Sequence, residues 1–144
     1  MESIFDPQGN RNIIERINKL SPITLSQWGK MTVSQMLVHC QQPIKVPLGM
    51  LQLKPNWMSL LFGKMIKKQM MQQEKFKIDL PTVKEFRISG EPTFEEARKE
   101  LIELIEIFAK EGHAAIKVKK HPFFGEMTMH EWDVLQWKHL DHHL

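Results

Sequence analysis

Residues 93–110 read TFEEARKELIELIEIFAK, and this stretch carries the clearest fold signal in the chain. Its apolar residues recur at intervals of three and four and so share one helix face: Phe94, Ala97, Leu101, Leu104, Ile105 and Phe108. Thr93 with Glu96 three residues later predicts a capping box, and Gly112 predicts the stop. The stretch therefore predicts a long amphipathic helix, from Thr93 to Lys110, that packs on a core.

Three further segments on either side of this helix show the same periodicity. The first covers residues 13–20 and the second residues 32–42. We expect each to end before a proline, Pro22 and Pro43 respectively, because proline lacks the backbone N–H that a helix interior requires. The last begins at Thr128. Since no alternating run is long enough to support a sheet, the pattern predicts an all-α helix bundle.

Two more capping boxes support these helix starts. Thr32 is followed three residues later by Gln35, and Thr128 by Glu131. The chain of 144 residues contains no internal repeat and no linker rich in glycine and serine. We therefore expect a single helical domain over residues 1–144.

A long crossover, residues 43–92, connects the second and third main helices. It contains a further helical stretch at residues 57–71, with lysines on one side. The other side is apolar and consists of Met58, Leu61, Phe62, Met65 and Ile66. Such a helix could lie on a membrane surface, but we favour packing of its apolar side against the bundle with the lysines in water. Residues 76–89, interrupted by Pro81, leave room for a short extended piece.

Composition excludes several classes of protein. The net charge of +3 is too small for a dedicated nucleic-acid binder. Cys40 is the only cysteine, which excludes an internal disulfide framework and a cysteine-only metal site. Residues 1–8 lack the apolar region of a secretory signal, and the longest apolar stretch, residues 57–62, is far too short to span a bilayer. We therefore expect a cytoplasmic protein with neither nucleic acid nor a membrane as its partner.

The histidines are the main chemical signal. His139 and His143 lie four residues apart on the stripe that also carries Trp132 and Leu135, so they replace apolar residues at positions that should face the core. His39 lies at the edge of the apolar face of the helix at residues 32–42. Buried neutral imidazoles require partners for their ring nitrogens.

A metal ion is one such partner. If the second and last helices are neighbours, His39, His139 and His143 converge, and three imidazoles leave a position open as in catalytic zinc sites. Spacing alone leaves surface or hydrogen-bonded histidines as the alternative. His142 offers a second pairing with His139, which we rank below His143 because it points further from the centre of the stripe.

Four motifs are similar to those of a known superfamily. They are MTVSQMLVHC at 31–40, HPFFG at 121–125, T-x-x-E-W at 128–132 and KHLDHH at 138–143. Together they resemble the DinB-like (YfiT-like) metalloprotein superfamily, in a branch known mainly as a domain of unknown function. The resemblance covers most of the chain and is most specific in its last quarter.

This resemblance implies a four-helix bundle in an up-down-down-up arrangement, with the long crossover between the second and third main helices. It also implies a divalent metal, typically nickel or zinc, bound by His39, His139 and His143. Some members of the superfamily are thiol-dependent transferases, in which the metal lowers the pKa of a low-molecular-weight thiol.

Other residues are candidates for the surroundings of this site. His121, Phe123, Phe124 and Gln136 are candidates for lining a substrate pocket. For the first three we favour the alternative of a tight turn whose aromatic rings plug one end of the bundle. Cys40 diverges by about 100° from His39 on the helix, so we expect it to be a small core residue rather than a ligand or nucleophile.

The functional expectation is a metal-dependent enzyme, such as a thiol-dependent S-transferase that acts on a small electrophile. Glu126 and Glu131 are the nearest glutamates in sequence, and Glu131 is expected to be occupied in its cap, which favours transfer over hydrolysis. The alternatives are a metal-dependent hydrolase, a non-catalytic metal-binding stress-response bundle and an interaction module that uses the basic crossover helix. We expect a small-molecule substrate. Dimerisation suits an enzyme of this size, although the sequence identifies no interface.

Overall fold

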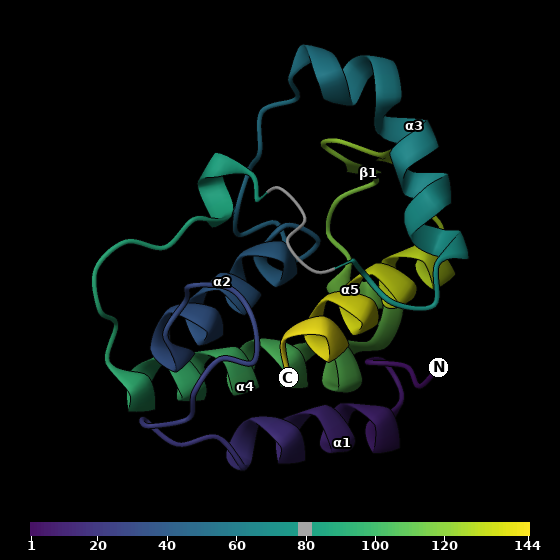
Figure 1. The fold of residues 1–144 in the computed structure, drawn as a ribbon. Coiled ribbons are helices and arrows are strands. Elements are labelled where there is room, and N and C mark those ends of the chain that lie inside the picture. The colour runs from purple at the N-terminus through teal and green to yellow at the C-terminus, as the bar shows by residue number, and fades with distance from the viewer. Residues whose placement is uncertain (78–81) are drawn as a thin grey trace.

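Helix α4, Phe94–Glu111, is the element on which much of the core packs. The computed structural model describes residues 1–77 and 82–144. α1 (Pro7–Asn18) and α2 (Val33–Lys45) both lie against α4, and α5 (Met129–His143) lies against α2 (Figure 1). The buried residues of α4 are the six predicted from its periodicity, so that prediction is confirmed. The described residues are mostly helical, as predicted.

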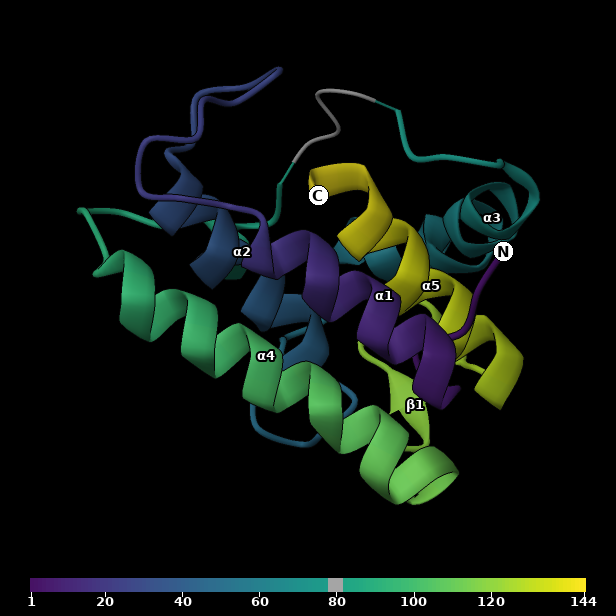
Figure 2. The same ribbon diagram turned by 90° about the horizontal axis from the view of Figure 1, so that it is seen from below.

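The remaining elements are short or peripheral. α3 (Trp57–Gln72) contacts α5, and Figure 2 shows α5 lying between α3 and the other helices. The short elements are the 3-10 helices η1 (Lys84–Phe86) and η2 (Gly112–Ala115) and an antiparallel hairpin of β1 (Lys120–His121) and β2 (Gly125–Glu126). None of the described helices has both the length and the apolar character needed to cross a bilayer.

The predicted helix ends are only partly right. The capping boxes of Thr32 and Thr128 are present. Among the described contacts, however, Thr93 forms no side-chain capping bond, so the box predicted there is wrong. Gly112 follows α4 with φ at 59°, a value that favours glycine, and its N–H bonds to the carbonyl of Phe108.

The prediction that the second helix ends before Pro43 is also wrong, because α2 continues to Lys45. Two contacts hold this last turn in place. Ile44 is fully buried in the core, and the Pro43 carbonyl accepts a bond of 3.2 Å from Nε2 of Gln136 on α5. These contacts offset the hydrogen bond that proline cannot donate. α1, in contrast, ends at Asn18, so Leu20 lies beyond it.

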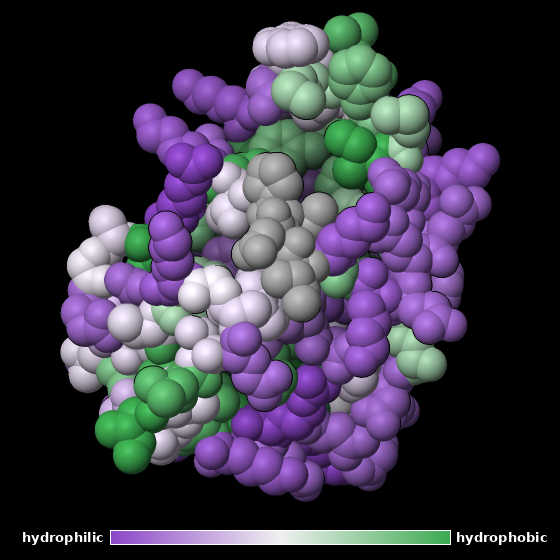
Figure 3. Space-filling view, viewed as in Figure 1, coloured by the Kyte–Doolittle hydropathy of each residue, from purple (hydrophilic) through white to green (hydrophobic). Residues whose placement is uncertain are grey.

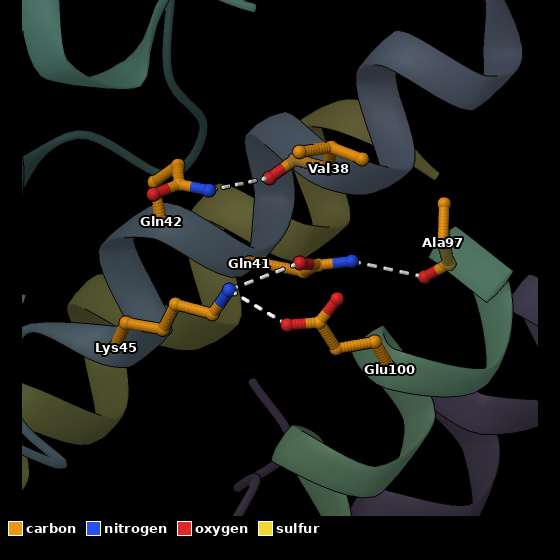
Figure 4. A network of polar contacts seen from close by, with 6 residues as sticks. All are labelled: Val38, Gln41, Gln42, Lys45, Ala97 and Glu100. Atoms are coloured by element: carbon orange, nitrogen blue, oxygen red, sulfur yellow. Dashed lines mark hydrogen bonds and ion pairs between the residues drawn. The ribbon is translucent and has the colours of Figure 1, made fainter. Parts of the chain in front are cut away.

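A polar network fixes α2 on α4 (Figure 4). The buried amide of Gln41 donates to the Ala97 carbonyl at 3.0 Å and accepts from Nζ of Lys45 at 3.2 Å. Lys45 also forms an ion pair of 2.7 Å with Glu100. Because both ends of the Gln41 amide are satisfied, its burial costs little and fixes the register of the two helices.

The apolar side predicted for residues 57–71 does not pack against the other helices as expected. Ile66 is half-buried, but Leu61 and Met65 on the same predicted side are 70% and 62% exposed. Gly63 takes the inward position instead and contacts the Phe123 carbonyl of the hairpin. The helix therefore turns a different face to the protein from the one that its hydrophobic pattern predicts.

The crossover continues from α3 through Phe76, which is buried in a second, smaller core beneath α3. Pro81 lies outside the described residues, and so does part of the extended piece considered for residues 76–89. The described part forms η1, which contacts α2. This contact brings the backbone of Phe86 next to the side chain of His39 on α2.

Candidate metal centre

Three histidines from two helices come together where α2 and α5 meet. His39 comes from α2, and His139 and His143 come from successive turns of α5. One ring nitrogen of each lies within 4.8 Å of the others. The ring centroids are separated by 4.8 to 5.1 Å. We call these three residues the histidine group.

A backbone carbonyl orients the first member of the group. Nδ1 of His39 lies 2.9 Å from the carbonyl oxygen of Phe86. A carbonyl only accepts, so Nδ1 carries the proton and Nε2 keeps its lone pair. Histidines that bind metals commonly donate their second N–H in this way.

The spacing of the ring nitrogens suits a metal ion. Nε2 of His39 and Nε2 of His139 are 3.2 Å apart. Two imidazole nitrogens at 2.0–2.1 Å from a tetrahedral zinc ion would be about 3.3 Å apart. His39 and His139 therefore already have the spacing of two zinc ligands, and a ring nitrogen of His143 lies within 4.8 Å of both.

Burial keeps the histidine group neutral. It lowers the pKa of His39 below its ordinary value, although the bond to Phe86 acts in the opposite direction. The pKa of His139 lies well below the ordinary value because of burial and the neighbouring histidines. Burial, followed by the charges of His39 and His142, lowers the pKa of His143 to about 3. All three rings are thus in the neutral form that binds metals.

One ring nitrogen in the group lacks a partner. Nδ1 of His139 is buried and has no hydrogen-bond partner among the described residues. Because His39 carries its proton on Nδ1, its Nε2 can only accept. The 3.2 Å contact between Nε2 of His39 and Nε2 of His139 is therefore a hydrogen bond only if Nε2 of His139 carries a proton and donates it. In that arrangement the Nδ1 lone pair of His139 is buried and unsatisfied, which carries a free-energy cost.

His142 lies outside the histidine group. Its ring packs at a tilt against Trp28, with centroids 4.4 Å apart, and lies 6.1 Å from the ring of Phe76. The structure thus groups His143, and not His142, with His139. This agrees with the ranking of the two candidates by their position on the helix.

A pocket of about 370 Å³ borders the group, and His143 forms part of its wall. Trp28 and Met36 supply apolar surface, and an ion pair of 2.7 Å between Arg16 and Asp141 lies at its edge. None of these four residues was predicted to be part of a site. Asp141 could have been suspected because it lies within the histidine motif at 138–143, whereas Trp28 lies in a loop whose path no sequence pattern indicated.

The four residues considered for a substrate pocket lie elsewhere. His121 is buried beside Trp132, accepts from the Phe123 N–H at 3.0 Å and stacks on Phe124 at 4.4 Å. Burial lowers the pKa of His121 to about 4. Gln136 is buried between α5 and α2. Other residues line the pocket beside the histidine group, so this geometry gives the substrate role of these four no support.

Two further side chains are placed as expected. Cys40 is fully buried in the main core, and burial raises the pKa of its thiol. Glu131 is engaged twice, by the Thr128 N–H at 2.8 Å and by Lys67 at 3.0 Å. The thiol is therefore a core residue, and the Glu131 carboxylate is occupied at the start of α5.

Comparison with known proteins gives one match. The profile of a family described as "Protein of unknown function (DUF1569)" matches residues 7–144. No curated protein and no solved structure matches the chain.

Proposed function

The chain belongs to the DUF1569 family of proteins of unknown function, and we propose that it binds a divalent metal ion through His39, His139 and His143. One observation carries the proposal: three neutral imidazoles from α2 and α5 converge within 4.8 Å. The Phe86 carbonyl supports it by holding the proton of His39 on Nδ1, away from the group.

We further propose that the site is catalytic and acts on a small molecule. Three protein ligands leave a position free on a tetrahedral ion, whereas structural zinc sites use four. The pocket that His143 borders has a volume typical of small-molecule sites. In this proposal, Trp28 and Met36 bind the apolar part of the substrate.

The favoured reaction is thiol-dependent S-transfer to a small electrophile. A bound nickel or zinc ion would supply Lewis acidity, which lowers the pKa of a thiol into the neutral range. Cys40 does not serve as that thiol, because it is buried in the core, so a low-molecular-weight thiol would be the co-substrate.

Hydrolysis is the alternative reaction. It needs a base for water, and Asp141, the carboxylate that lines the pocket, is already engaged by Arg16. Glu131 lies further away, at the start of α5, and is engaged by Lys67. A non-catalytic metal-binding bundle of the stress-response type is the alternative function. In that case the ion would only join α2 to α5.

The superfamily and the topology of the bundle are part of the same proposal. We place the chain with the DinB-like superfamily and expect an up-down-down-up four-helix bundle formed by α1, α2, α4 and α5 as a single domain. Residues of all four helices contribute to the main core, and α3 lies in the connection between α2 and α4, which supports this arrangement. A cytoplasmic location and a homodimer remain parts of this proposal.

Elemental analysis of untagged protein tests the metal site. Wild-type protein loaded with zinc or nickel and then desalted should hold close to one ion per chain. His39→Ala should lose it, whereas His130→Ala, at an exposed histidine of α5, should keep it. Wild-type protein that retains no metal would make the histidine group structural and end the proposal.

The catalytic part needs a separate measurement. Loaded wild-type protein would be incubated with panels of low-molecular-weight thiols and electrophiles, and the loss of free thiol would be followed. Turnover that disappears in Trp28→Ala while the bound metal remains would support catalysis in the pocket. Stoichiometric metal without turnover of any thiol or electrophile in the panels would favour the non-catalytic alternative.

A further inference from the structure

The inner face of α3 is held against the hairpin at one point of close contact. A Cβ atom built on Gly63 would lie 1.9 Å from the carbonyl oxygen of Phe123, so only glycine allows this approach. The rotation of α3 about its axis is therefore constrained at this turn.

Two lysines hold the rest of the inner side of α3 in place. Nζ of Lys67 on α3 lies 3.0 Å from the Glu131 carboxylate and donates to the Glu126 carbonyl at 2.8 Å. Nζ of Lys138 on α5 donates to carbonyls in the last turn of α3, including that of Met70 at 2.9 Å. Contacts at three points along α3 thus determine which face of this helix points outward.

The outward face is apolar. Residues 57, 61 and 65 are spaced by four and follow one line along the helix, with residue 58 beside them. We call these side chains the α3 stripe: Trp57, Met58, Leu61 and Met65. All four are exposed, Trp57 to 67% and Leu61 to 70%. Figure 3 shows hydrophobic side chains gathered over the outer part of α3, at the top of the view.

Positive charge surrounds the stripe. From Lys54 to Gln73 the sequence contains four lysines and not one aspartate or glutamate. Lys64 and Lys68 follow the stripe on α3 and are exposed, and Lys54 precedes the helix. The acidic Glu126 and Glu131 lie on the inner side of α3, where they face Lys120 and Lys67.

We infer that the α3 stripe docks this protein on the surface of an anionic lipid bilayer. Leu61 and the methionines would enter the boundary between headgroups and acyl chains, and Trp57 has the amphipathic ring that favours this depth. Lys64 and Lys68 would meet the lipid phosphates. An anionic bilayer matches both the apolar side chains of the stripe and the positive charge of the surrounding segment, which lacks acidic residues.

A second copy of the chain fits this face less well. Two copies would bring the lysines around the stripe together with no acidic residue in the segment to pair them. Four side chains on three turns also fall far short of the roughly 20–30 residues a side of a standard interface. Charge and size therefore both favour lipid.

Co-sedimentation with vesicles tests the docking. Full-length protein should pellet with vesicles of phosphatidylcholine and phosphatidylglycerol in equal parts, and much less with pure phosphatidylcholine. Trp57→Ser with Leu61→Ser should weaken partitioning by about tenfold or more, because both side chains lose their transfer from water. A matched double variant, Ile23→Ser with Leu25→Ser, changes apolar residues outside α3 that are even more exposed, and it should bind as the wild type does.

A second pair of variants tests the charge. Lys64→Gln with Lys68→Gln should weaken binding to the anionic vesicles severalfold, whereas Lys99→Gln with Lys110→Gln, on exposed positions of α4, should not. Circular dichroism verifies that each variant is folded. Equal binding to both vesicle types, or none to either, would overturn the inference. So would a wild-type dimer that the stripe variant dissociates without any vesicle binding, since a second copy would then cover the stripe.

Discussion

Nδ1 of His39 lies 2.9 Å from the carbonyl oxygen of Phe86, 47 residues further along the chain. This bond joins α2 to the short helix η1 and sets the side of the imidazole that carries the proton. The histidine group therefore depends on the crossover as well as on the two helices that carry its side chains.

His139→Ala tests the histidine group through stability. The wild-type protein should gain about 2.7 kcal/mol of unfolding free energy when free zinc is at roughly 100 times its dissociation constant. The variant should gain nothing, because it lacks one of the three ligands. Urea unfolding with and without zinc measures both values, and His130→Ala should respond to zinc like the wild type. A variant that zinc stabilises as much as it does the wild type would contradict the site.

Gly63→Ala tests the close approach of α3 to the hairpin. An exposed helical glycine would gain about 0.5–1 kcal/mol from this change. Here the added Cβ would lie 1.9 Å from the Phe123 oxygen, so we expect a loss of about 1–3 kcal/mol. Urea unfolding gives the sign. A gain in stability would show that α3 does not contact the hairpin in this way.

His121→Gln tests the buried histidine of the hairpin by its dependence on pH. Burial lowers its folded-state pKa to about 4, so below about 6.5 the unfolded chain takes up a proton that the folded chain excludes. This contribution to stability is complete above pH 6.5 and is lost as the pH falls towards 4. Replacement by glutamine should make the loss of unfolding free energy in this window shallower, by up to about 1.4 kcal/mol per pH unit. Identical slopes for the two proteins would contradict the burial of a neutral His121.

Cys40 provides a test of the core. Its thiol is fully buried and its pKa is raised by burial, so the reactive thiolate is scarce in the folded protein. We expect a water-soluble disulfide reagent at mildly alkaline pH to react negligibly with folded protein and completely in urea. The absorbance of the released thiol measures the reaction. Rapid reaction of the folded protein would place Cys40 outside the core.

The helices and the histidine group were largely predictable, because both follow from local spacing. The six buried residues of α4 share one face by periodicity alone, and the spacing of four between His139 and His143 places both rings on one side of α5. His39 was recognisable because it interrupts the edge of an apolar face.

Contacts made by the backbone were not predictable in this way. Every residue carries a carbonyl group, so nothing in the sequence marks that of Phe86 as the partner of His39 or that of Phe123 as the neighbour of Gly63. The outward face of α3 was missed for the same reason, since the approach of Gly63, and not hydrophobicity, decides which side is buried. Pro43 was misjudged because the packing of Ile44 comes from other helices.

The long separation of His39 from His139 makes a bound metal selective for the folded chain. The two residues are 100 positions apart. In an unfolded chain, bringing them together costs about 4 kcal/mol from the length-dependent part of loop closure alone. The unfolded protein would therefore hold an ion mainly through the local pair on α5, which is a much weaker site. Native protein would outcompete the unfolded protein for scarce metal, so the bound ion would be found mainly in folded molecules.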